Sequence, residues 1–551
     1  MAIKVEKNSL IFLPLGGSNE IGMNVNLYHY NGKWIIIDLG AGFAGEDLPG
    51  ADMVAPDLEF VYKNLPNFLG IVLTHAHEDH LGAVGWLHDQ LNLPIYCTPF
   101  TGEIVKNKLE QSGALGRAKI ITVQPGSRFK VGDFDLEMIQ ITHSIPEMNG
   151  IMLRTPSGNI FHTGDWKFDP SPVIQPTSDL AKLEAIGKEG VLAMVCDSTN
   201  VFNDRFSGSE ADLLPSMTDL IKEQKGMVFV TTFASNVARI DTICRAAEAT
   251  GRKVALAGLS LNKITKFAKS TGYLKDLAPF ISDTEVKKLP REQVLVICTG
   301  CQGEDRAALM KIVRQEHQFL KITSKDSVIF SSKIIPGNEK KIFALLNAFV
   351  RLRCEVFTEK NYKIHVSGHP SREELTKMYE LVKPTIAIPV HGEPTHIHAH
   401  CKLAKSVGVP KIVEIQNGEM VLLGPVPEPR SLKQVRFGYL GVDGYVLQPS
   451  DGAVMQIRRK MKEAGIVIVT AVIDRSGNLL KPPVVRTPGI IDEQANAPFV
   501  RFIEEEVEEI MLTNTKTPED KLEKKISSHI KKLLEREIGK IPMVEITIVR
   551  V

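Results

Sequence analysis

Cysteine is scarce in this chain, net charge is nearly absent, and long apolar runs are missing. The 551 residues include only seven scattered cysteines, which argues against a disulfide framework and suits a reducing compartment. The net charge of +1 means that a polyanion must bind at a local groove, because no general positive field exists to attract it. No run approaches the roughly 20 apolar residues of a bilayer crossing, and the N-terminus lacks a signal-peptide core. We therefore expect a cytoplasmic protein without a membrane segment.

The length and the distribution of apolar runs predict several domains. A chain of 551 residues is too long for one hydrophobic core. Short buried strands that end at polar residues are predicted at 34–38, 70–74 and 191–197. A βαβ alternation follows, with strands at 225–233, 253–257 and 293–298 and helices at 236–250 and 303–317. This alternation predicts a second, parallel-sheet domain inserted into the first.

The C-terminal third has a different organisation. The segment 425–455 is rich in proline and glycine and is predicted to be a linker. A small α+β domain is predicted over 456–551, with strands at 465–474, 483–487 and 543–551 and helices at 497–512 and 518–538. The predicted domain limits are therefore 1–205 with 361–424, 206–360, 425–455 and 456–551.

The segment Thr74-His75-Ala76-His77-Glu78-Asp79-His80 contains three histidines and an aspartate within six residues. An apolar run precedes it and Gly82 follows it, so a strand that ends in a turn aims these side chains at one point. Imidazole nitrogen and carboxylate oxygen are ligands that Zn²⁺ prefers. The spacing predicts a metal site with a catalytic role.

One turn cannot supply the ligands of two metal ions, but later segments offer more. His143, Asp165 and His391 each follow an apolar run in the way that a loop follows a strand. The two oxygens of the Asp165 carboxylate can bridge two ions. Asp38 and Asp197 also stand at predicted strand ends, where catalytic groups are often held on loops by a rigid sheet.

The order of these residues carries a family resemblance. Asp38, the H-x-H-x-D-H cluster, His143 and Asp165 resemble the metallo-β-lactamase superfamily. Three later residues are similar to motifs A, B and C of the β-CASP nucleases: Asp197 in Cys196-Asp197-Ser198-Thr199-Asn200, His369 in His365-Val366-Ser367-Gly368-His369, and His391 in Pro389-Val390-His391-Gly392-Glu393. Together with residues 15–24 and 299–304 and the extra C-terminal domain, the match is to the bacterial ribonuclease J family over essentially the whole chain.

The resemblance implies the fold and the ligand sets. The fold class is α/β: a metallo-β-lactamase αββα sandwich with an inserted parallel-sheet β-CASP domain and a small α+β C-terminal domain. His75, His77 and His143 would hold one zinc ion, Asp79, His80 and His391 would hold the other, and Asp165 would bridge them. Two Zn²⁺ per subunit are expected, with Mn²⁺ or Mg²⁺ as further ions that support activity.

The resemblance also implies the reaction. Metal-activated water would attack the phosphodiester of RNA, giving 5′→3′ exonuclease and endonuclease activity in RNA maturation and decay. Asp79 and Asp38 would assist at the metals, and His369 backed by Asp197 would protonate the leaving oxygen. A pocket for a 5′-monophosphate would contain Ser235, Asn236, His365, Ser367 and Gly368. Expected partners are RNA, further subunits in a homodimer or homotetramer joined by the C-terminal domain, and RNA-decay or ribosome components.

Several alternatives remain open from the sequence. Asp197 can simply cap the following Ser-Thr-Asn turn, and His396, His398 and His400 are interpreted as helix-surface residues. A glyoxalase II-like thioester hydrolase would need neither the insertion nor His369. In β-CASP nucleases of DNA repair the motif C position resembles valine, so His391 favours RNA. A non-catalytic scaffold is disfavoured because every expected ligand is present.

Overall fold

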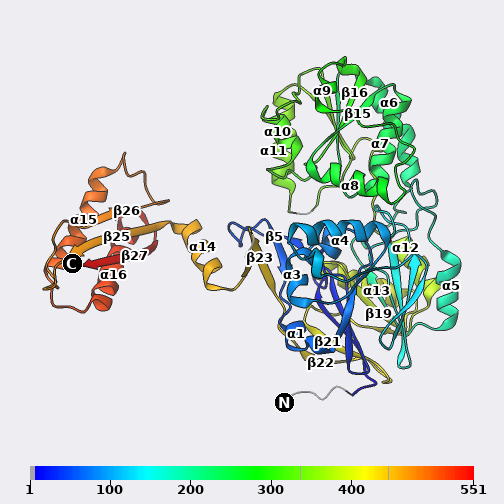
Figure 1. The fold of residues 1–551 in the computed structure, drawn as a ribbon, viewed down its shortest axis with the longest axis horizontal. Helices are drawn as coiled ribbons and strands as arrows, with labels where there is room; N and C mark the ends of the chain where they lie inside the picture. Colours follow the sequence, from blue (N-terminus) through cyan, green and yellow to red (C-terminus); the bar gives the residue numbers. More distant parts are fainter. Residues whose placement is uncertain (1–5, 336, 445) are drawn as a thin grey trace. The chain divides into compact units, whose positions relative to one another are not determined.

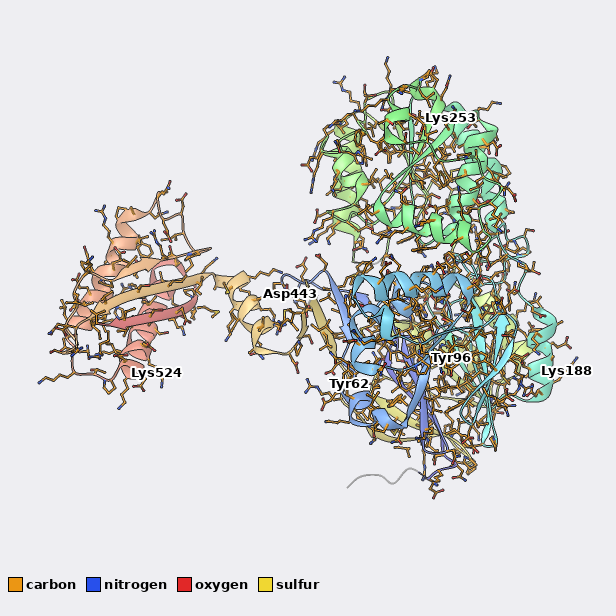
Figure 2. The ribbon with its side chains drawn as sticks, in the orientation of Figure 1. Tyr62, Tyr96, Lys188, Lys253, Asp443 and Lys524 are labelled. Atoms are coloured by element: carbon orange, nitrogen blue, oxygen red, sulfur yellow. The ribbon has the colours of Figure 1, made fainter. Side chains whose placement is uncertain are left out.

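The computed structural model describes residues 6–335, 337–444 and 446–551, and this part of the chain forms two compact units (Figure 1). Unit 1 contains the residues up to Gly42 and Ala55–Gly438, and unit 2 contains Phe43–Val54 and Tyr439–Val551. Lys188 and Lys253 in unit 1 and Lys524 in unit 2 project outward (Figure 2). None of the helices in the described residues combines the length and apolar character that a bilayer crossing needs.

Two sheets form the centre of unit 1. The first has the strand order β22-β21-β1-β2-β3-β6-β7-β8, and the second has the order β20-β19-β13-β12-β11-β10-β9. The strands of the first sheet are β1 (Leu10–Gly16), β2 (Val25–Tyr30), β3 (Lys33–Ile37), β6 (Phe68–Val72), β7 (Ile95–Cys97), β8 (Ile120–Thr122), β21 (Glu419–Gly424) and β22 (Arg430–Gln434). Those of the second are β9 (Arg128–Val131), β10 (Phe134–Gln140), β11 (Asn149–Thr155), β12 (Gly158–His162), β13 (Ala193–Asp197), β19 (Ile386–Val390) and β20 (Lys411–Ile412).

The two sheets pack face to face through alternate residues of their strands. Ile35 and Ile37 of β3 enter the same buried cluster as Ile151 and Leu153 of β11. This spacing of two follows from the alternation of side chains along a strand. One apolar face of each sheet is thereby removed from water, which is the main favourable contribution to the packing of the sandwich.

Helices cover the outer faces of the sandwich. Buried residues of α5 (Leu180–Glu189), α12 (Arg372–Val382) and α13 (Pro394–Ser406) form a second cluster with the outward side chains of the second sheet. The parallel strands β6, β7 and β8 are connected through α3 (Val84–Leu91) and α4 (Pro99–Gln111). The layers are therefore helix, sheet, sheet and helix, which confirms the predicted αββα sandwich.

A five-stranded parallel sheet is inserted between β13 and β19, which are themselves neighbours in the second sheet. Its order is β15-β16-β14-β17-β18, from β14 (Val228–Thr231), β15 (Lys253–Ala257), β16 (Val294–Cys298), β17 (Ser327–Phe330) and β18 (Glu355–Thr358). Its helices include α6 (Leu213–Glu223), α7 (Val237–Ala249), α8 (Leu259–Ser270), α10 (Ala308–Val313) and α11 (Glu339–Arg351). The predicted parallel-sheet insertion is confirmed.

One local prediction is wrong, and a second segment contains more regular structure than expected. The helix predicted at 303–317 is only α10, because Gly303 has a φ of 73° and keeps the preceding segment in a turn. The predicted linker 425–455 contains β22, the hairpin of β23 (Tyr439–Asp443) and β24 (Val446–Pro449), and the start of α14 (Ala453–Ala464). β22 follows a proline-rich stretch and lies at a sheet edge, where a proline does not interrupt a ladder. The domain limits given above stay predictions.

The C-terminal part of unit 2 is a small α+β fold. Its sheet has the order β26-β25-β27, with β25 (Ile466–Ile473), β26 (Val484–Arg486) and β27 (Met543–Arg550). β27 pairs in parallel with β25, so the last strand completes a sheet of its own subunit. The helices α15 (Ala497–Leu512) and α16 (Glu519–Ile538) bury Val507, Ile526 and Ile530 against this sheet.

Candidate metal centre and phosphate pocket

The candidate ligands lie at the carboxyl ends of strands in the two central sheets. The H-x-H-x-D-H segment follows β6, and its last residues form the short helix α2 (Glu78–Leu81). His143 follows β10, Asp165 follows β12 and His391 follows β19. Among the described residues, three groups of histidine and aspartate have ligand atoms close enough to hold a metal ion, and all three share Asp165.

The first group contains His75, His77, His143 and Asp165. His77 Nδ1 lies 3.1 Å from His75 Nε2 and 3.0 Å from His143 Nε2. Asp165 Oδ2 is 3.9 Å from His75 Nε2 and 3.8 Å from His143 Nε2. Three ring nitrogens and one carboxylate oxygen therefore surround a single point, which is a donor set typical of zinc.

The second group contains Asp79, His80, His391 and Asp165. Asp79 Oδ2 lies 3.1 Å from His391 Nε2 and 3.6 Å from His80 Nε2. The other oxygen of Asp165, Oδ1, is 3.2 Å from His80 Nε2 and 3.7 Å from His391 Nε2. Asp165 thus turns one oxygen toward each group, as the bridging role requires.

Hydrogen bonds to the outer ring nitrogens orient three of these histidines. His143 Nδ1 donates to the Gly368 carbonyl at 2.6 Å, and His80 Nδ1 donates to Asp38 Oδ2 at 2.6 Å. His391 Nδ1 is 2.6 Å from Thr199 Oγ1. When the outer nitrogen of a neutral ring carries the proton, the inner nitrogen has a free lone pair for a metal ion. An acceptor that holds this proton also raises the basicity of the inner nitrogen.

The electrostatics of the centre favour a bound cation. Burial lowers the pKa of His77 to about 4, and burial with the neighbouring imidazoles lowers the pKa of His75. These rings are neutral at pH 7 and offer lone pairs. Burial also lowers the pKa of His391, but Asp165 and the hydrogen bond to Asp79 outweigh it and raise this pKa to about 9. The carboxylates around the second group therefore attract positive charge strongly.

A buried oxygen provides a direct test of whether the centre fits metal ions. Asp165 Oδ1 is removed from solvent and accepts no hydrogen bond of regular geometry, although His80 Nε2 is near it. A buried carboxylate oxygen without a partner is costly. A cation held by the second group would satisfy this oxygen, so the residues fit bound metal.

His369 and Asp197 form a pair beside the metal ligands. His369 Nδ1 donates to Asp197 Oδ2 at 2.8 Å, and the other oxygen, Oδ1, accepts from the Thr199 amide at 2.8 Å. Asp197 therefore both caps its turn and holds His369. Burial lowers the pKa of His369, but Asp197 and Asp165 raise it above its ordinary value overall. The ring is thereby favoured as a proton donor near neutral pH.

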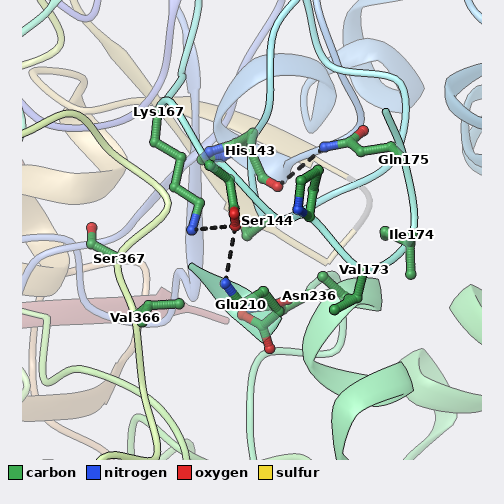
Figure 3. A pocket seen from close by; sticks show the side chains of 13 residues that line it. His143, Ser144, Lys167, Val173, Ile174, Gln175, Glu210, Asn236, Val366 and Ser367 are labelled. Carbon is green, nitrogen blue, oxygen red and sulfur yellow. Dashed lines mark hydrogen bonds and ion pairs between the residues drawn. The ribbon is translucent and has the colours of Figure 1, made fainter. Parts of the chain in front are cut away.

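A pocket with polar and apolar lining opens next to the first group (Figure 3). Among its lining residues are His143, Ser144, Lys167, Asn236 and Ser367. Lys167 Nζ lies 3.0 Å from the carboxylate of Asp169, a buried ion pair that sequence reasoning missed. The lining includes hydroxyl, amide and ammonium groups, which are donors that a phosphate accepts from. It also includes two carboxylates and several apolar side chains, from Asp169, Glu210, Pro172, Val173, Ile174, Ala238 and Val366.

The five predicted phosphate-pocket residues differ in their placement. Asn236 and Ser367 line the pocket, and the carbonyl of Gly368 contacts His143. Ser235 and His365 are not among its lining residues. His365 Nδ1 instead lies 3.2 Å from Arg239 Nη1.

The helix-surface interpretation is wrong for one of the three late histidines. His400 is fully buried, and its two ring nitrogens contact Ser198 and Tyr379. It lies on the side of α13 that packs against the second sheet, where the hydrogen bonds satisfy both nitrogens. Thr199 was also missed, although its position two residues after Asp197 is a signal for a turn hydroxyl at the site.

A metallo-β-lactamase sandwich with this histidine and aspartate centre and an inserted parallel sheet defines a metallo-hydrolase of the β-CASP type. Family models agree with this class along the chain. They match a beta-lactamase superfamily domain at 33–185, the beta-CASP domain of ribonuclease J at 225–349, a Zn-dependent metallo-hydrolase RNA specificity domain at 355–414 and the ribonuclease J C-terminal domain at 453–551.

Curated relatives extend the match to nearly the full length. The chain is 40% identical to a ribonuclease J of Sinorhizobium meliloti over 89% of this chain and 88% of that one. It is 34% identical to a ribonuclease J of Thermus thermophilus over 97% and 94% of the two chains. The chain belongs to the ribonuclease J family and is a metal-dependent RNA hydrolase. A crystal structure of a protein of unknown function from Enterococcus faecalis shares the fold, with 17% identity, a TM-score of 0.52 and coverage of 75% of this chain and all of that one.

Proposed function

We propose that this chain is a zinc-dependent ribonuclease that trims RNA in the 5′→3′ direction, prefers a 5′-monophosphate end and also cuts internally. One observation carries the proposal: Asp165 turns one carboxylate oxygen toward each of two ligand groups, and a pocket with hydroxyl, amide and ammonium groups in its lining adjoins one of them. This arrangement suits a reacting phosphate at the centre and a terminal phosphate beside it.

Two Zn²⁺ fit the ligand sets described above. His75, His77 and His143 would hold one ion, Asp79, His80 and His391 would hold the other, and Asp165 would contact both. When bound, such ions neutralise charge on the scissile phosphate and lower the pKa of water. Mn²⁺ or Mg²⁺ is proposed to support activity in place of zinc.

The remaining groups of the chain orient the ligands and move a proton. Asp38 holds the Nδ1 proton of His80, so that Nε2 faces the metals. Asp197 holds the Nδ1 proton of His369. His369 Nε2 then donates a proton to the 3′-oxygen as its bond to phosphorus breaks. The ring is reprotonated from solvent before the next cleavage.

The pocket next to His143 would recognise the 5′ end. Asn236, Ser367 and the backbone around Gly368 are proposed to contact a terminal phosphate, with Ser235 and His365 near the same strand of RNA. A pocket that holds one phosphate disfavours the larger, more highly charged 5′-triphosphate. An RNA that threads past the centre without occupying the pocket would be cut internally.

A timed digestion of 5′-labelled RNA tests the proposal. Matched RNAs that carry a 5′-monophosphate, 5′-triphosphate or 5′-hydroxyl are compared, and zinc is quantified on the same sample. Rapid release of labelled mononucleotide from the monophosphate RNA alone, with two metal ions per chain, is expected. Equal rates on all three ends would contradict end recognition, whereas cleavage without bound metal would contradict the metal mechanism.

We further propose a cytoplasmic homodimer or homotetramer that is joined by residues 456–551 and works with RNA-decay or ribosome components. β27 supports a subunit contact, because this strand lies at a sheet edge and the side chain of its residue Val549 is exposed. Analytical ultracentrifugation of the full chain tests the assembly. A monomer at every concentration would contradict it.

A further inference from the structure

Phe202 is an exposed aromatic side chain on the loop that also contacts the catalytic residues. Its side chain is 58% exposed. In the same loop, Thr199 contacts His391, and Asn200 donates to Ser367 Oγ and to the carbonyl of His369. These contacts fix the start of the loop against the site. The apolar ring of Phe202 is therefore largely exposed to water within a few residues of the candidate reacting centre.

The ring of Phe202 contacts the ring of His396, in the first turn of α13. The two ring centroids lie 5.0 Å apart, with an interplanar angle of 59°. His396 is half-buried, and its Nδ1 is removed from solvent without a hydrogen-bond partner. A buried nitrogen without a partner is uncommon. The pair thus presents the exposed part of the Phe202 ring as an apolar face, while His396 Nδ1 is not accessible to solvent.

Charges of both signs act on His396. Burial lowers the pKa of His396, the carboxylates of Glu393 and Asp197 raise it, and the positive charges of His391 and Lys333 lower it, with a lowered pKa overall. Lys333 is exposed. An exposed aromatic ring together with a positively charged side chain is a combination that binds a nucleobase and its phosphate in single-stranded nucleic acids.

We propose that Phe202 and His396 form a stacking platform for one nucleobase of the RNA, on the 3′ side of the cleaved bond. This inference rests on the proposed nuclease function. The pocket that would take the 5′ end adjoins His143 of the first ligand group. Phe202 is connected through Thr199 to His391 of the second group. A strand with its first phosphate in the pocket therefore continues toward Phe202 after it crosses the centre.

The platform gives this site a means to hold RNA of any sequence. Every base has a π-face, and its stacking on an aromatic side chain contributes about 1–3 kcal/mol as measured by alanine substitution. Loss of one stacked base therefore corresponds to about a 5- to 150-fold loss of affinity. Stacking on the retained strand also helps to keep the RNA bound after the first nucleotide leaves.

Abasic substitution combined with mutation tests the platform. Cleavage of a 5′-monophosphate RNA is measured for the wild type, Phe202→Ala and Phe202→Trp, with a single abasic nucleotide placed in turn at each of the first positions 3′ of the cut. We expect Phe202→Ala to raise KM by about 5- to 150-fold with little change in kcat, and Phe202→Trp to restore it. At one abasic position, the KM of the wild type should become equal to the KM of Phe202→Ala.

Controls distinguish the possible failures. Phe206, also exposed on this loop, provides the matched control, and Phe206→Ala should leave KM unchanged. An unchanged KM for Phe202→Ala, with active wild type, overturns the platform but not the nuclease function. An inactive wild type with metal bound overturns the nuclease function itself. If Phe202→Ala does not fold, the abasic scan on the wild type decides, and equal KM at every position overturns the proposal.

Discussion

Asp38 Oδ2 lies 2.6 Å from His80 Nδ1, and Asp38 Oδ1 accepts a hydrogen bond from the Thr74 amide at 2.8 Å. One buried carboxylate therefore connects the strand end at Thr74 to a ligand in α2. Asp38 holds this position with a φ of 63°, a left-handed conformation that costs an ordinary residue about 1–2 kcal/mol. The backbone there is held in place by the surrounding contacts, and the carboxylate orients the imidazole.

Removal of this carboxylate should weaken the metal centre without removing a ligand. We expect Asp38→Ala to lower metal affinity or activity by about 10- to 100-fold, because partners of metal-bound histidines typically contribute this much. Zinc titration against a competing chelator, with cleavage assays on the same samples, measures the effect. Asp38→Asn keeps the shape and one acceptor oxygen and should lose less. Wild-type zinc affinity in Asp38→Ala would contradict this role.

Removal of the metals should abolish cleavage but leave RNA binding. Treatment with EDTA is expected to stop cleavage because it removes the metal ions. The double substitution Asp79→Ala, His80→Ala should have the same effect, because the second ligand group loses two of its four donors. A gel-shift assay with the same RNA should still detect a complex, since the pocket residues are untouched. Cleavage that survives both treatments would show that the nuclease activity does not depend on this centre.

Gly368 is expected to tolerate no side chain. A Cβ atom at this position would lie 2.8 Å from His143 Cε1 and 2.9 Å from its Nδ1, closer than carbon atoms approach in proteins. Gly368→Ala should therefore displace the ring, reduce the number of tightly bound metal ions and lower kcat. A Cβ atom at Gly116 would meet nothing within 4 Å, so Gly116→Ala is the matched control and should behave as the wild type.

The grouping of the candidate ligands was predictable from the sequence because each of them follows an apolar strand. The strands before His75, Asp165 and His391 end within a few residues of them, and carboxyl ends of strands in one sandwich meet at one edge. The contact between Thr199 and His391 was not predictable, because it joins residues 192 positions apart. Burial of His400 depends likewise on which side of α13 packs against the sheet.

Loop and edge structures were less accessible to sequence reasoning. Proline and glycine in 425–455 suggest a linker, but β22 pairs with β21 at a sheet edge, where prolines before the strand do no harm. In the same way, the apolar pattern of 303–317 suggests a longer helix than α10. Local composition sets the propensity of such segments, but tertiary pairing decides their structure.

His369 should control protonation of the leaving oxygen. We expect His369→Ala to lower kcat by about 10²- to 10⁴-fold, the usual contribution of a general acid, with unchanged metal content. An RNA with a 3′-bridging sulfur provides the test, because a thiolate leaves without a proton and should restore much of the lost rate. An equal loss on the oxygen and sulfur substrates would contradict proton donation. Asp197→Asn should lower kcat less, since His369 keeps its place.

The buried pair of Arg239 and Glu210 should be the main electrostatic contribution to stability near the site. Arg239 is fully buried; its Nε donates to Glu210 Oε1 at 2.7 Å and its Nη1 donates to the Ser331 carbonyl at 2.9 Å. Arg239→Met leaves the Glu210 carboxylate without its partner, and breaking such a pair costs about 3–5 kcal/mol. A clear fall in melting temperature is expected. Lys188→Met removes an ion pair with Glu184 in which both side chains are exposed and should cost no more than about 1 kcal/mol; equal effects of the two substitutions would contradict the assignment.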